Sequence, residues 1–170
     1  MISRKARAFW PLFSVLLLTD CATKRLAEAH LLPVHSPREI LGDVLRFTLA
    51  YNPGAAFGLS VGPASRWFFT SVALGMTALF FHWYREAEAH DRSFAVALAL
   101  VASGALGNLA DRLRSPRGVV DFIDIGFGDV RFWTFNVADA ALTVGALLLA
   151  TILWRRDHDL PPLATRTAER

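Results

Sequence analysis

The chain has 170 residues, of which 54% are apolar and 19% charged, and its mean hydropathy is +0.35. These values are atypical of soluble globular domains and predict a membrane protein with one domain, while a lone Cys21 excludes an internal disulfide. The formal net charge is +3, but Lys and Arg are scattered and gather partly at the ends of apolar segments, so we interpret them as topology signals and expect no nucleic-acid partner.

The first apolar segment, residues 9–29, follows a basic N-terminus and in this respect resembles a cleaved secretory signal peptide. A cleavage site before Cys21 would need a small residue at position 20, where the chain has Asp20. Apolar character also resumes beyond this point. We therefore expect the segment to be retained as a transmembrane helix.

The connection after this segment contains "DVLRFTLAYN", residues 43–52, in which polar or small residues alternate with Leu, Phe and Tyr. This period of two is typical of a strand with one apolar face. The aromatic-rich "DVRFWTF", residues 129–135, is a candidate to pair with it. We expect these segments to form a small sheet, or cradle, at the outer membrane surface.

Three further apolar segments approach the length of about 20 residues that a bilayer core requires. They cover residues 67–84, 93–113 and 135–154. The sequence thus predicts an all-α membrane protein with four transmembrane helices and a small extracytoplasmic β-rich cradle. Residues 1–156 form the membrane domain, and residues 157–170 form a polar cytoplasmic tail. Because the number of spans is even and the charges that flank the termini and the loop "REAEAHDR" favour the inner side, both termini are expected in the cytoplasm.

Polar residues gather at the outer ends of these predicted helices and in the outer loops, where ionisable groups are costly unless they are paired or used. Asp121 and Asp124 fall in the outer loop before the last helix, and Asp139 falls in that helix's first turn. The other members of the group are Asp20, Lys24, Asn52, Asn108, Asp111 and Arg112.

Several of these residues also have a purely structural interpretation. Asp20 and Lys24 are four residues apart, as in a helical ion pair, and Asn136 with Asp139 fits a helix N-cap. Asp111 is placed to pair with neighbouring arginines, and small residues of the third segment would let helices approach closely. The residues concerned are Arg112 and Arg114 for the ion pair, and Ser103, Gly104 and Gly107 for the close approach.

Five motifs in order, "LLLTDCATK", "YNPGAAFG", "GALGNLADRL", "VVDFIDI" and "FNVADAALTVG", resemble the lipoprotein signal peptidases, also called signal peptidase II. The resemblance covers residues 10–155. It implies an aspartic protease of the bacterial inner membrane that cuts the signal peptide from prolipoproteins, just before a cysteine that carries diacylglycerol. The implied catalytic pair is Asp121 and Asp139. The implied supporting or substrate-binding residues are Asp20, Lys24, Asn52, Gly54, Asn108, Asp111, Arg112 and Asn136.

The chemistry of such a pair requires two carboxyl groups that do not both ionise easily, so that one acts as a base and the other as an acid. No covalent intermediate, metal or cofactor is needed, and the five histidines lack ligand spacing. Asp139 starts a helix, whose dipole favours a charged carboxylate, whereas Asp121 is expected on a loop. We therefore expect Asp139 to be the ionised partner. Asn52, Asn108 and Arg112 are candidates to hold the substrate main chain.

Two other classes of function remain open from the sequence. A small transporter or ion-conducting subunit would also gather acidic groups in a bundle, but it would carry ionisable residues along a path across the membrane. The inner halves of the last three predicted helices carry almost none, apart from His82. A non-catalytic adaptor would leave the two carboxylates without a shared purpose. The resemblance implies a lipidated prolipoprotein as partner, beside the phospholipid bilayer, and the expected state is a monomer.

Overall fold

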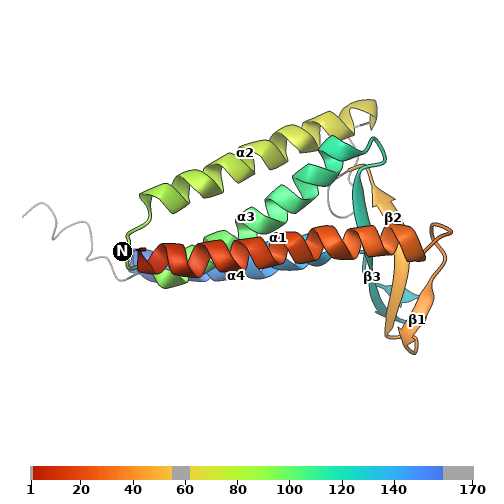
Figure 1. The fold of residues 1–170 in the computed structure, drawn as a ribbon. Coiled ribbons are helices and arrows are strands. Elements are labelled where there is room, and N and C mark those ends of the chain that lie inside the picture. Colours follow the sequence, from red (N-terminus) through yellow and green to blue (C-terminus); the bar gives the residue numbers. More distant parts are fainter. Residues whose placement is uncertain (1, 55–61, 159–170) are drawn as a thin grey trace, which may run out of the picture.

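The computed structural model describes residues 2–54 and 62–158. Within them the long helices form a bundle, and an antiparallel sheet lies across the end of the bundle opposite the N-terminus (Figure 1). The helices are α1 (Arg4–His30), α2 (Ser65–Glu86), α3 (Arg92–Arg114) and α4 (Val137–His158), with the short 3-10 helix η2 (Gly62–Ala64) before α2. The strands are β1 (Arg38–Leu41), β2 (Leu45–Asn52), β3 (Val119–Phe127) and β4 (Val130–Arg131), in the spatial order β1-β2-β3-β4.

The four predicted helices are present, with boundaries set by polar caps. The Ser3 hydroxyl accepts a hydrogen bond from Ala6 N at 3.2 Å before α1, and the Asp91 carboxylate accepts one from Phe94 N at 3.0 Å before α3. The fourth helix begins two residues later than predicted, because Asn136 caps it. It ends at His158, beyond the predicted domain boundary, and the rest of the predicted tail lies outside the described residues.

Helix α3 is the centre of the bundle and packs against the other three long helices. Its small residues make this possible, as expected. A Cβ added to Gly104 would collide with the carbonyl oxygen of Ala138 in α4, and one added to Gly107 would lie 2.5 Å from the Asp20 carboxylate of α1. The close approach therefore brings the first turn of α4 and the middle of α1 to the same stretch of α3.

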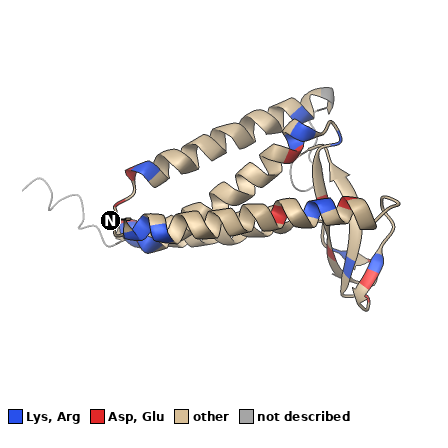
Figure 2. Cartoon of the chain, in the orientation of Figure 1, with Lys and Arg blue, Asp and Glu red and all other residues tan. Residues whose placement is uncertain are grey.

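Two of the described helices, α3 and α4, are long and apolar enough to cross a membrane. They differ in burial, since 72% of the apolar window of α3 but only 22% of that of α4 is buried inside the protein. Large apolar side chains such as Leu147 of α4 and Leu74 of α2 are exposed. Figure 2 shows that charged residues lie mainly near the helix ends and in the sheet, while the middle parts of the helices carry few.

The predicted strand is β2, and the expected cradle is present. Strand β2 pairs with β3, with Ala50 opposite Asp121 and Asn52 opposite Val119. The sheet packs on the end of α1, where Ala27 and Leu31 contact a cluster that includes Leu49. The aromatic segment contributes β4, which pairs with β3 and not with β2 as we expected.

The prediction that Asp121 and Asp124 lie in a loop is wrong, because both belong to β3. The first four residues of this strand, residues 119–122, are all buried, so apolar and polar positions do not alternate there. A strand that is covered on both faces has no period of two for sequence analysis to detect.

Candidate active site

Asp121 lies in the buried part of β3, with 3% of its surface exposed. Its Oδ1 accepts a hydrogen bond of 2.7 Å from Asn136 Nδ2, and the Asn52 side chain from β2 interacts with the same carboxyl group. Strand pairing with β2 therefore places Asp121 beside Asn52 and fixes which face of the sheet it occupies.

Asp139 lies in the first turn of α4, as predicted, and forms a reciprocal cap with Asn136. Asp139 N donates to Asn136 Oδ1 at 2.9 Å, and Asn136 N donates to Asp139 Oδ2 at 3.2 Å. Asp139 Oδ1 accepts a further bond of 2.7 Å from Asn108 Nδ2 in α3. Both oxygens of this carboxyl group thus accept hydrogen bonds.

Asn136 connects the two carboxyl groups. The residue is fully buried, and its backbone N–H reaches Asp139 while its side-chain amide reaches Asp121. The same Nδ2 lies 3.2 Å from Val120 O and 3.2 Å from Asn108 Oδ1. The N-cap interpretation is confirmed by this geometry, but the cap accounts for only half of the contacts that Asn136 makes.

A buried polar cluster lies beneath these residues. Lys24 Nζ is 2.8 Å from Asp20 Oδ2, 3.0 Å from Asp111 Oδ2 and 2.9 Å from Asn108 Oδ1. Asp20 Oδ1 also accepts from Ala138 N at 2.9 Å, and Asp111 Oδ2 accepts from Val120 N at 3.2 Å. The predicted Asp20–Lys24 ion pair is therefore present, and the cluster joins α1, α3, β3 and α4.

Arg112 does not pair with Asp111 as the structural interpretation suggested. Among the contacts of the described residues, Asp111 pairs with Lys24 and lies 4.0 Å from Arg114, whereas Arg112 donates to Gly54 O at 3.1 Å and to Asn108 O at 3.3 Å. Arg112 Nε is buried and has no hydrogen-bond partner in the described part of the chain. Gly54 in turn donates from its N–H to Asn52 Oδ1 at 3.0 Å.

These side chains line a cavity of about 500 Å³ between α3, α4 and the sheet. Asp121, Asp139, Asn52, Asn108 and Arg112 all contribute to it. Sequence analysis missed its other walls, including the aromatic segment before α4, which was assigned only to strand pairing. These walls are Ala50, Tyr51, Pro53, Val119, Phe132, Trp133, Thr134, Phe135, Leu142 and Thr143.

Burial and, after it, the nearby charge of Asp139 raise the pKa of Asp121 from its ordinary value of 3.8 to about 7. Hydrogen bonds from Asn136 and Asn52 and the charge of Lys24 act in the opposite direction but do not cancel this effect. A carboxyl group with this pKa keeps its proton at neutral pH about half of the time. The site thus holds two carboxyl groups in different environments, as an acid and a base require.

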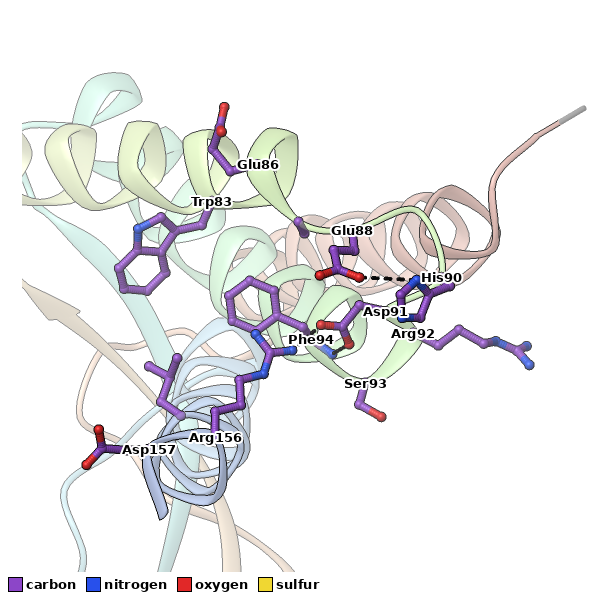
Figure 3. Close-up of a pocket in the computed structure, with 12 residues that line it drawn as sticks. Trp83, Glu86, Glu88, His90, Asp91, Arg92, Ser93, Phe94, Arg156 and Asp157 are labelled. Atoms are coloured by element: carbon purple, nitrogen blue, oxygen red, sulfur yellow. Dashed lines mark hydrogen bonds and ion pairs between the residues drawn. The ribbon is translucent and has the colours of Figure 1, made fainter. Parts of the chain in front are cut away.

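Asp124 does not belong to this cavity. Three residues after Asp121 on the same strand, it accepts from Thr48 Oγ1 at 3.1 Å and from Arg131 Nε at 2.9 Å. A second cavity, of about 1140 Å³, lies at the other end of the bundle beside the loop between α2 and α3 (Figure 3). There Arg156 pairs with Asp91 and stacks over the Phe94 ring, 4.7 Å from its centre. None of the predicted site residues line this second cavity.

Comparison with known proteins gives one family. The family model described as signal peptidase (SPase) II matches residues 12–155. A lipoprotein signal peptidase of Ectopseudomonas mendocina is 39% identical over 159 residues, which cover 91% of this chain and 93% of the relative. One of Coxiella burnetii is 40% identical over 155 residues, which cover 88% of this chain and 93% of the relative. A solved bacterial membrane enzyme is similar with a TM-score of 0.77 and 27% identity, covering 89% of this chain and 90% of the other.

Proposed function

We infer the chemistry of this site from one premise: the chain belongs to the signal peptidase II family, and it removes signal peptides from prolipoproteins. We propose that it does so as an aspartic endopeptidase, with Asp139 as the base and Asp121 as the acid. The observation that carries this assignment is the shared cavity, in which the two carboxyl groups are held by Asn108 and Asn136.

In the proposed reaction, the Asp139 carboxylate takes a proton from a water molecule that attacks the scissile carbonyl carbon. Protonated Asp121 gives its proton to the carbonyl oxygen, so a tetrahedral intermediate forms without a charged oxygen. Collapse of this intermediate breaks the C–N bond: the proton held by Asp139 passes to the leaving amine, and one hydroxyl proton of the intermediate returns to Asp121. The two groups titrate as a coupled pair throughout.

The hydrogen bonds support these roles. Asn108 Nδ2 and Asn136 N donate to the two oxygens of Asp139, which holds this carboxyl group in place in the first turn of α4. Asp121 sits in a more buried place, and its raised pKa of about 7 keeps a proton available. Neither role requires a metal or a cofactor.

Arg112 and Asn52 are proposed to hold the main chain of the substrate on either side of the scissile bond. Both line the cavity, and Arg112 Nε is a buried donor without a partner in the described residues, which a substrate carbonyl would satisfy. Asn108 would act mainly through Asp139, since its amide N–H₂ already points there.

The membrane arrangement follows from the same proposal. All four long helices cross the bilayer, with both termini in the cytoplasm of a bacterial inner membrane and the sheet on the outer side. The exposed apolar faces of α2 and α4 would then meet lipid and the apolar part of the signal peptide. We propose that the protein works as a monomer.

The substrate is proposed to be a prolipoprotein whose cysteine already carries diacylglycerol. The acyl chains would stay in the bilayer, where each buried CH₂ contributes about 0.8 kcal/mol, and they would fix the depth of the scissile bond. The test is to incubate the purified protein in detergent with lipidated and unlipidated forms of one precursor. We expect a new N-terminal lipid-modified cysteine from the first form and far slower cleavage of the second. Equal rates would show that the lipid is not recognised, and a different new N-terminus would refute the proposed cleavage position.

A further inference from the structure

Lys24 is a cation buried in the bundle directly beneath the two carboxyl groups. Its exposed fraction is 2%, and the three protons of its ammonium group have three acceptors, one each on Asp20, Asp111 and Asn108. Among the contacts of the described residues, it touches neither Asp121 nor Asp139. Its link to Asp139 runs through Asn108, the residue that contacts both.

The amide of Asn108 has two ends, an oxygen that only accepts hydrogen bonds and an N–H₂ that only donates. An ammonium group only donates, so the atom of Asn108 that lies 2.9 Å from Lys24 Nζ must be the oxygen. The N–H₂ end is then directed to Asp139 Oδ1 at 2.7 Å. Asn136 Nδ2 also approaches the Asn108 oxygen, at 3.2 Å, and favours the same orientation.

We propose that Lys24 is a positioning residue for the reaction: its ammonium group holds the Asn108 amide in the one orientation that donates to Asp139. Without this cation, the amide oxygen can turn towards Asp139. An oxygen there would repel the carboxylate instead of stabilising it, and the base would lose its alignment with the water. This inference rests on the proposed role of Asp139 as the base.

Removal of Lys24 alone would also leave two carboxylates buried near each other without their cation, which is costly for folding. The experiment therefore compares Lys24→Met with the double variant Lys24→Met/Asp111→Asn. The double variant keeps the net charge of the cluster, because one positive and one negative group are lost together. Asp111→Asn alone is the matched control, since its amide oxygen can still accept from Val120 N and from Lys24.

Each variant is purified in detergent and assayed with the lipidated precursor for kcat, KM and thermal unfolding. We expect the double variant to unfold near the temperature of Asp111→Asn, while its kcat falls roughly 10- to 100-fold and its KM changes less than about twofold. The basic limb of its kcat profile should also lie at higher pH than that of Asp111→Asn, because the charge of Lys24 lowers the pKa of Asp121 and only the control keeps that charge.

A double variant that folds and keeps kcat within about twofold of Asp111→Asn overturns the inference, and so does one that does not fold. Asp139→Asn is assayed in parallel. If that variant is active, the proposed function fails; if it is inactive while the double variant keeps its kcat, only the role of Lys24 fails.

Discussion

Asn136 does more at the residue scale than its position before a helix suggests. As an N-cap it needs only a side-chain oxygen that accepts from Asp139 N. Its amide N–H₂, however, donates to Asp121 at 2.7 Å, and this second contact depends on β3 passing beside the start of α4. The sequence predicts the cap but not this contact, because the bond joins two elements.

Replacement of Asn136 can separate the two roles. Asn136→Ser keeps a good N-cap oxygen but has no N–H₂ to hold Asp121, so we expect a melting temperature close to that of the parent and a clearly lower kcat. Asn136→Ala loses the cap as well and should cost about 1 kcal/mol of stability in addition. Thermal unfolding and cleavage assays on the two variants check this. If Asn136→Ser cleaves as fast as the parent, the contact with Asp121 has no catalytic role.

The raised pKa of Asp121 also predicts how stability depends on pH. The ordinary value is 3.8 and the folded value is about 7, so between these values the folded protein binds more protons than the unfolded chain. The free energy of unfolding should therefore fall as pH rises from about 4 to 7, by on the order of 1 kcal/mol per pH unit from this group. Asp121→Asn removes this contribution. We expect the variant to lose less stability than the parent between pH 5 and pH 8 in detergent, and a parallel loss in both proteins would contradict the assignment.

At the scale of the elements, small residues of α3 decide how closely the helices approach. Gly104 faces the backbone of α4 at Ala138, one residue before Asp139. The position of the base thus depends on a helix contact that has no room for a side chain.

Gly104→Ala should therefore destabilise the protein by roughly 1–3 kcal/mol and reduce cleavage, because the new methyl group would displace the first turn of α4. Gly75→Ala is the matched control, since a Cβ at this position of α2 meets nothing within 4 Å. We expect the control to be neutral or stabilised by about 0.5–1 kcal/mol. Differential scanning calorimetry of the two variants and the parent measures the change in thermal stability. Equal effects of the two substitutions on stability and cleavage would mean that the close α3–α4 contact at Gly104 does not determine either property.

The elements also show why sequence analysis succeeded for the helices and β2 but failed for β3. Long apolar runs and a period of two are local signals, and they predicted α1 to α4 and the strand ending at Asn52. Strand β3 is buried on both faces at its start, so its pattern carries no period, and its acidic residues looked like those of a loop. The cavity walls Phe132 to Phe135 were missed for a related reason, because their place depends on how β3 and α4 meet.

For the molecule as a whole, the separation of charges along the bundle predicts an orientation. The N-terminus and the α2–α3 loop lie at one end, and the sheet lies at the other (Figures 1 and 2). Asp121 belongs to strand β3 of that sheet, and Asp139 belongs to the first turn of α4. An enzyme that processes exported precursors needs its site at the outer surface. Basic residues near the termini favour the cytoplasm for the first end.

Reporter fusions in living bacteria test this orientation. Fusions after residue 156 and within residues 85–92 should report the cytoplasm, and fusions within residues 36–44 should report the outer side. A reversed pattern would place Asp121 and Asp139 on the cytoplasmic face, where the exported part of a precursor cannot reach them.

The central claim is that Asp121 and Asp139 together activate the water that cuts the prolipoprotein. The most direct measurement is the rate of cleavage of a lipidated precursor by Asp121→Asn and Asp139→Asn, with Asp129→Asn as a control because Asp129 is exposed and outside the cavity. We predict that both dyad variants remain folded in detergent and form no detectable product, while the control cleaves at the parental rate. Parental cleavage by either dyad variant would contradict the account.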